Sequence, residues 1–280
     1  MGIRNLAYCV LDVPKKPVIR AEPVAPVVVS VLKKKGNGIP QVQDWRRLAV
    51  STAPDALDKT SPKAKEAFDP ATLSQTAYAL LRSRLLPLNP THILIERQRF
   101  RSMGSKHILE WTIRVNMFES ILYAVLCTLK AEGIWDGQVV GVTPGKVGPF
   151  WLGEEEADGN GAEGKHRKER RSKSAKVRNK GLKIDLVRRW LDAGDVVGLG
   201  SEGVETVARQ YMEKWDRGPG GRRGKREGKE EDMGKLDDLA DCLLQGMAWV
   251  HWEENKRLAL KSGVEALLDQ PITIAQNKDA

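Results

Sequence analysis

The chain has 280 residues, which is enough for one well-packed domain with insertions, and its 46 Lys and Arg against 37 Asp and Glu give a net charge of +9. This charge favours an acidic partner, nucleic acid first, although many basic proteins have no such partner. No apolar run approaches the ~18–20 residues of a membrane span and no secretory signal opens the chain, so no membrane partner is expected. The three cysteines, Cys9, Cys127 and Cys242, lack metal-binding spacing and are predicted to be reduced core residues.

The first half of the chain alternates between strand-like and helical segments. Residues 3–13 and 42–50 are predicted strands, separated by a proline-rich excursion over about 15–40. Asp69-Pro70 predicts a helix start, and the leucines that follow keep helical spacing up to Pro87. Residues 91–96 are a short apolar run ending in Glu96, typical of a buried strand that carries an acid to the edge of a sheet.

A basic loop follows, and residues 107–131 predict a long helix that is apolar around much of its circumference. Such a helix is central to the core, or serves both the core and a dimer interface. A strand at 139–142 and a turn at 143–145 come next. The basic run in 154–180 lacks apolar periodicity, which predicts disorder in the free protein and phosphate contact when DNA is present; a solvated charge run is the alternative.

Short helices are predicted at 183–191 and 204–215, a flexible low-complexity segment at 216–234, and a last long helix at about 235–261. Asp238 and Asp241 lie three residues apart there, so both face the same way, whereas Asp237 suits the positive end of the helix dipole. Together with Glu96 they would supply the oxygen ligands that Mg²⁺ prefers. Each piece alone is weak, because strand-end glutamates and helical aspartate pairs are usually just solvated.

Three motifs in this order resemble the fungal mitochondrial Holliday-junction resolvases, relatives of bacterial RuvC in the RNase H-like superfamily. They are Gly2-Ile3-Arg4-Asn5-Leu6-Ala7-Tyr8, Ile95-Glu96-Arg97-Gln98 followed by Arg99-Phe100-Arg101, and Asp238-Leu239-Ala240-Asp241. The resemblance implies an α/β, RNase H-like mixed sheet flanked by helices. It further implies a single nuclease domain over 1–280 with insertions at about 15–40, 154–180 and 216–234, and a mitochondrial location.

The resemblance also implies an activity: a homodimeric endonuclease that cuts two opposed strands of a four-way DNA junction with Mg²⁺ or Mn²⁺. The family's metal ligands correspond to Glu96, Asp238 and Asp241, and Lys183 is the candidate for a basic side chain near the scissile phosphate. The basic loop residues are expected on the DNA backbone: Arg97, Arg99, Arg101 and Lys106. Two alternatives are a catalytically incomplete junction-binding protein and a ribonuclease acting on RNA–DNA hybrids.

One motif departs from the family pattern. The family's first strand ends in Asp-X-Gly and its Asp is a metal ligand, but here X is Met1, so that Asp would stand immediately before the chain. The first, central strand of the sheet is therefore expected to be missing. We expect the natural protein to extend upstream through a strand ending in Asp and an import sequence, and the 280-residue chain to bind Mg²⁺ poorly and cut little.

Overall fold

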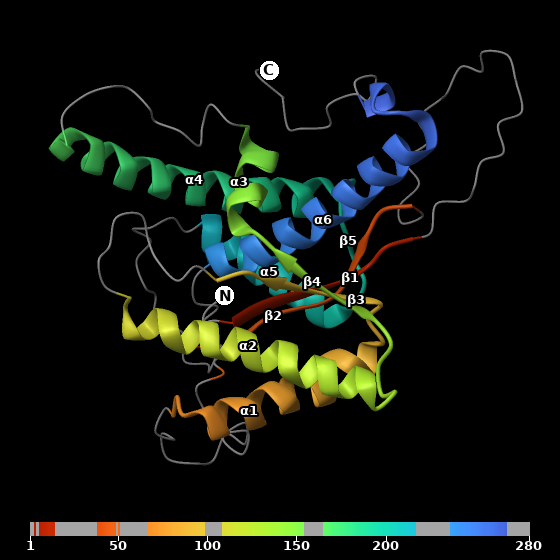
Figure 1. Ribbon diagram of the computed structural model, residues 1–280. Coiled ribbons are helices and arrows are strands. Elements are labelled where there is room, and N and C mark those ends of the chain that lie inside the picture. Colours follow the sequence, from red (N-terminus) through yellow and green to blue (C-terminus); the bar gives the residue numbers. More distant parts are fainter. Residues whose placement is uncertain are drawn as a thin grey trace, which may run out of the picture.

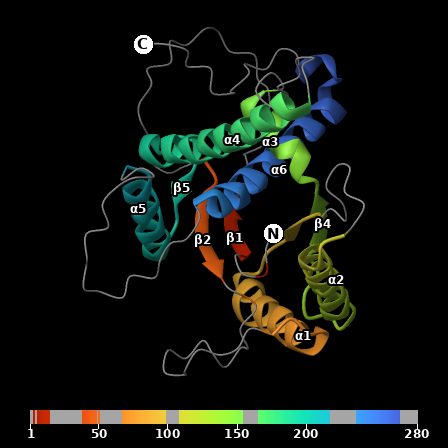
Figure 2. The same cartoon turned by 90° about the vertical axis from the view of Figure 1, so that its left-hand side faces the viewer.

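The computed structural model describes residues 3, 6–14, 38–48, 50, 67–98, 108–153, 165–216 and 236–267, with side chains left out at 165–177 and 216. The strands form a layer between two groups of helices (Figures 1 and 2). Helices α1 (Pro70–Ala79) and α2 (Glu110–Ala131) cover one side. Helices α3 (Pro144–Leu152), α4 (Lys165–Ala193) and α6 (Leu236–Ser262) cover the other. The mixed α/β architecture predicted from the sequence is confirmed.

The strand layer is divided into two sheets. Strand β1 (Leu6–Asp12) pairs antiparallel with β2 (Gln41–Leu48), which pairs parallel with β5 (Gly198–Leu199). Strand β3 (His92–Glu96) pairs parallel with β4 (Gln138–Val142). Among the described residues no strand joins β1 to β3.

Each face of this layer has its own hydrophobic core, because successive side chains of a strand point to opposite faces. In β3, Ile93 and Ile95 join the core under α1 and α2. Leu94 joins the core under α3, α4, α6 and α5 (Glu202–Asp216). In β2, Val42 and Trp45 share one core although they are three residues apart. Opposite Val10 and Leu11 of β1 the register shifts, because β2 carries one extra residue between Val42 and Trp45, as in a β-bulge.

Helix α1 begins where the sequence predicted. Asp69 Oδ1 accepts a hydrogen bond from the backbone N–H of Thr72 at 3.0 Å, and Pro70 occupies the first helical position, where no N–H is needed. This hydrogen bond to the carboxylate lowers the pKa of Asp69. The helix continues as a π-helical turn, η2 (Leu80–Leu85), and a 3₁₀ turn, η3 (Leu86–Leu88), before β3.

The apolar helix α2 is a core element. Its buried side chains Val115, Phe118, Leu122 and Leu126 belong to the core shared with α1. By length and composition alone this helix could also cross a membrane, a test that the core helices of globular proteins pass too. The predicted core role of this helix is confirmed.

Two sequence predictions about the second half are wrong. Residues 144–152 form helix α3 rather than continuing from a turn at 143–145, because Val147 and Trp151 gain a buried place against the core. Residues 165–180, predicted to be disordered, form the first part of helix α4. That stretch has no glycine or proline and is rich in Lys and Arg, which favour helix, and it runs directly into the packed residues 184–191.

Helices α5 and α6 match their predictions, whereas the short strand β5 was not predicted. Helix α5 (Glu202–Asp216) packs against β2 and β5, and α6 spans the predicted last helix before a short 3₁₀ turn, η4 (Glu265–Leu267). The segments 15–37 and 217–235 lie outside the described residues, and so do 51–66 and 154–164, so the predictions made for them remain predictions.

The cysteines divide into two kinds. Cys9 on β1 and Cys242 on α6 are half-buried. Burial raises the pKa of the Cys9 thiol well above its ordinary value and raises the pKa of the Cys242 thiol to about 12. Cys127 is exposed on α2, so its predicted core position is wrong: this helix buries only the face that meets α1 and β3, and Cys127 lies off that face.

Alkylation should separate the two kinds. At pH 8 the thiols of Cys9 and Cys242 stay protonated and unreactive, since the thiolate is the nucleophile and their pKa values lie far above this pH. We expect iodoacetamide to modify Cys127 at least about tenfold faster than either of them. Peptide mass spectrometry over time measures this, with labelling in denaturant as the control; equal rates at all three in the native protein would contradict it.

Candidate functional site

A cleft of about 1620 Å³ separates the two sheets. Its walls are β1 on one side and β3 on the other, and α6 runs along it. The predicted metal ligands Glu96, Asp238 and Asp241 all line this one cleft, although they come from a strand and a helix about 140 residues apart in the chain. The structure thus places in one cleft the three acids that the sequence singled out.

Glu96 reaches the cleft because of its place in β3. Glu96 lies two residues after Leu94, so their side chains point to the same face of the strand. The Leu94 side chain belongs to the core beneath α6, and the Glu96 carboxylate is therefore directed to the α6 side. The chain after it is held at two points: Arg97 N–H donates to Val142 O at 2.8 Å, and Gln98 N–H donates to Glu119 Oε2 at 2.9 Å. The strand end that carries Glu96 is therefore fixed.

Helix α6 places its acids by anchoring its backbone. The indole N–H of Trp45 donates to Leu239 O at 3.1 Å, and that of Trp151 donates to Leu244 O at 3.0 Å. Both indole rings are almost wholly buried, and Leu239 lies between Asp238 and Asp241. Gly246 allows the helix to approach β1, because a Cβ there would stand 2.8 Å from Leu11 Cδ1.

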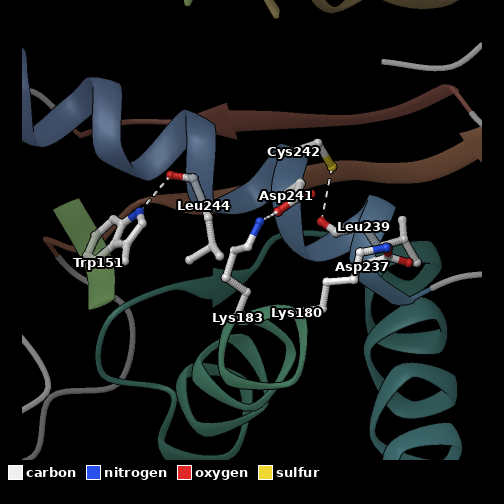
Figure 3. A network of polar contacts seen from close by, with 8 residues as sticks. All are labelled: Trp151, Lys180, Lys183, Asp237, Leu239, Asp241, Cys242 and Leu244. Atoms are coloured by element: carbon white, nitrogen blue, oxygen red, sulfur yellow. Dashed lines mark hydrogen bonds and ion pairs between the residues drawn. The ribbon is translucent and has the colours of Figure 1, made fainter. Parts of the chain in front are cut away.

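Two lysines of α4 form ion pairs with two aspartates of α6 (Figure 3). Lys180 Nζ lies 2.5 Å from Asp237 Oδ2, and Lys183 Nζ lies 2.5 Å from Asp241 Oδ1. The hydrogen bond to Asp237 raises the pKa of Lys180. Lys183, predicted from the family resemblance, thus stands directly beside the predicted ligand Asp241.

The acids suit a divalent cation in chemistry but are not assembled around one point. Carboxylate oxygens are the ligands that Mg²⁺ and Mn²⁺ take, and three such side chains line the cleft. Within the described ranges, however, no three His, Cys, Asp or Glu side chains gather closely enough to hold a metal ion. The three carboxylates fit a divalent cation by their chemistry. To bind one ion together they require side-chain movement or a further ligand.

The predicted DNA-contacting residues are only partly described. Arg99, Arg101 and Lys106 lie outside the described residues. Arg97 is exposed and does not line the cleft; its side chain crosses β4 at Gly141, where a Cβ would stand 2.6 Å from Arg97 Nε and 2.9 Å from the Tyr123 hydroxyl. Arg97 therefore follows Glu96 directly in the chain, but its side chain lies on the α2 side of the strands.

Sequence reasoning missed the partnership of Lys180 with Asp237. Lys180 fell in a segment predicted to be disordered, and no partner on another helix was predicted for Asp237. A signal was present: Lys180 and Lys183 are three residues apart, and Asp237 and Asp241 are four apart, so each pair lies on one face of its helix. Matching the two faces would have predicted both ion pairs.

Two fungal proteins of one name are similar to this chain. A protein of Schizosaccharomyces pombe named "Cruciform cutting endonuclease 1, mitochondrial" is 26% identical over 192 residues, covering 67% of this chain and 60% of the relative. A Saccharomyces cerevisiae protein of the same name is 22% identical over 269 residues, covering 86% and 70%. The chain thus spans 60% of the length of the first of these relatives.

A solved structure, titled "Crystal Structure of the Yeast Mitochondrial Holliday Junction Resolvase, Ydc2", superposes with a TM-score of 0.52 at 19% identity, covering 96% of this chain and 83% of the other. This likeness confirms the RNase H-like fold expected from the sequence. The family described as "Mitochondrial resolvase Ydc2 / RNA splicing MRS1" matches residues 1–258, well over half of the chain. The chain therefore belongs to the mitochondrial resolvase Ydc2 and RNA splicing MRS1 family.

Proposed function

We propose that this protein is a mitochondrial endonuclease that resolves four-way DNA junctions by divalent-metal-dependent hydrolysis of opposed phosphodiester bonds. One observation carries the proposal: the cleft between the two sheets is lined by Glu96, Asp238 and Asp241, the acids that correspond to the family's metal ligands. The family match over residues 1–258 and the names of both fungal relatives support it.

Glu96, Asp238 and Asp241 would hold Mg²⁺ or Mn²⁺. When bound, such an ion lowers the pKa of attacking water and stabilises charge on the phosphate. The chain's own residues do the rest. β3 fixes Glu96 at one wall of the cleft, the buried indoles fix the start of α6, and Lys183 offers a positive charge next to Asp241, where a phosphate oxygen would need one.

Basic segments would hold the DNA without reading its sequence. Arg97, Arg99, Arg101 and Lys106 follow the strand that carries Glu96, and residues 165–180 contain nine Lys and Arg against one acid. Contacts of this kind go to backbone phosphates, which suits an enzyme that recognises the shape of a junction.

A side-by-side assay tests the proposal. The purified protein is given a four-way junction, a duplex of the same sequence and an RNA–DNA hybrid, with and without Mn²⁺. The proposal expects paired nicks in the junction alone and only with the cation. Junction binding without cutting would favour the alternative, a catalytically incomplete junction-binding protein, an outcome consistent with the open arrangement of the acids. Cutting of the hybrid alone would favour a ribonuclease.

The proposed enzyme is a homodimer, and the start of α2 is the proposed interface. Large apolar side chains are exposed there, with Leu109 at 70% and Ile113 at 53% of their area, next to Ile108 and Trp111. Two opposed cuts in a symmetric junction call for two symmetric sites, which a twofold interface provides. Exposed apolar side chains gathered in this way mark interaction surfaces.

We expect Ile113→Lys to convert the dimer to a monomer, because it places a charge in the proposed interface without touching the core. Met117 of the same helix packs against the core and is the poorer choice. Light scattering gives the mass. Leu260→Lys, at a side chain 80% exposed on α6, is the matched control and should leave the dimer intact. An unchanged mass for Ile113→Lys would remove α2 from the interface.

A further inference from the structure

Two ion pairs connect α4 to the acidic start of α6. Lys180 and Lys183 face α6 from successive turns of α4, and Asp237 and Asp241 face α4 from successive turns of α6 (Figure 3). Asp238 lies between the two aspartates in sequence, so three carboxylates gather within five residues and two of them have a lysine partner. Carboxylates this close repel one another, and the two ammonium groups offset that repulsion.

The two pairs are accessible to water. In each pair one side chain is exposed and the other is partly covered: Lys180 is 58% and Asp237 16% exposed, and Asp241 is 50% and Lys183 22% exposed. Water and salt screen such pairs, so the attraction that holds each lysine on its carboxylate is small. A lysine is also a single point charge on a flexible stem, which can swing to another anion without disturbing the helix that carries it.

Asp241 cannot serve both partners fully. Its Oδ1 lies against Lys183 Nζ, and the same carboxylate is one of the three proposed ligands of a divalent cation. An ammonium group and a divalent cation repel one another, so the presence of one weakens the binding of the other.

We propose that Lys180 and Lys183 are exchangeable counter-ions of the α6 carboxylates. Without a divalent cation they neutralise Asp237 and Asp241. When a divalent cation binds, they leave the carboxylates and become available to the DNA phosphate. This inference rests on the proposed function for the identity of the cation site, but it makes a separate claim about what occupies that site's carboxylates beforehand.

The sign of one change separates this proposal from a merely structural role. If the lysines compete with the cation, then replacing both with methionine, which keeps the apolar stem, should tighten Mn²⁺ binding by about tenfold, since two nearby positive charges are lost. If they only position the aspartates, the same replacement should weaken Mn²⁺ binding. Titration of Mn²⁺ by electron paramagnetic resonance, without DNA, reads this directly.

Stability gives a second, independent measurement. The Lys180→Met/Lys183→Met protein should unfold at a lower temperature than the wild type without cation, and saturating Mn²⁺ should remove most of that difference. Arg178→Met is the matched control: it removes one positive charge from an exposed position on the same helix, two residues before Lys180. Lys183→Arg keeps the charge and should bind Mn²⁺ as the wild type does.

The proposal is overturned if the double variant binds Mn²⁺ no more tightly than the wild type, or if Arg178→Met produces the same tightening. If the double variant does not fold, Lys183→Met alone decides the question by the same criterion, because Lys183 pairs with the cleft carboxylate Asp241. The junction-cutting assay is run separately. A protein that never cuts can still show the exchange, and a protein that cuts can fail to show it, so the two claims fail independently.

Discussion

Glu96→Gln is expected to lower the rate of junction cutting by about two orders of magnitude or more while leaving junction binding within about twofold. The amide keeps the shape of the carboxylate but removes the charge with which β3 contributes to the cleft. Binding survives because it depends on basic side chains and phosphates rather than on this acid. The measurement is single-turnover cleavage, in a form of the protein whose wild type cuts, beside a gel-shift titration.

A second readout does not depend on activity. The same variant should bind Mn²⁺ more weakly than the wild type, because one of three oxygen ligands has lost its charge. Glu132→Gln removes the same charge at an exposed position at the end of α2 and should change neither quantity. Normal cutting and normal Mn²⁺ affinity in Glu96→Gln would show that Glu96 is not a ligand.

Trp45→Ala should have the largest effect on stability, a loss of about 3–5 kcal/mol in the free energy of unfolding. Trp45 is wholly buried in β2, its ring lies 5.3 Å from that of Tyr211, and its N–H donates to Leu239 O. Alanine would leave a cavity and remove the donor at once. Urea unfolding followed by circular dichroism measures the change.

Trp45→Phe divides this effect into its parts. Phenylalanine fills most of the space but has no N–H. The part of its loss in unfolding free energy that the smaller ring does not explain reflects the lost hydrogen bond, about 1 kcal/mol. Because that bond holds the turn between Asp238 and Asp241, Trp45→Phe should also weaken Mn²⁺ binding. A cost below about 1 kcal/mol for Trp45→Ala would mean that this part of the core repacks freely.

Much of the fold could be predicted from local patterns. The Asp69-Pro70 helix start, the strand ending at Glu96 and the acidic start of the last helix follow from capping, alternation and helical spacing, and all three stand in the structure. Helix α3 did not follow: Gly145, Gly148 and Pro149 disfavour a helix, which forms because Val147 and Trp151 are buried against the core.

The site was predictable as a set of acids but not as an arrangement. The resemblance supplied Glu96, Asp238 and Asp241, and the cleft that contains them exists only once two sheets and α6 have come together. The lysine partners stand 57 and 58 residues from their aspartates, so no local rule reaches them. The exposure of Cys127 was likewise decided by which face of α2 meets its neighbours.

The alternation of β3 between two cores has a consequence for how this segment tolerates insertions and deletions. Removing or adding one residue among Ile93, Leu94 and Ile95 would turn Glu96 to the α2 side and exchange the side chains offered to the two cores. A change of two residues would leave every remaining side chain pointing to the same face as before. Length variation in β3 is thus acceptable only in steps of two, whatever the amino acids involved.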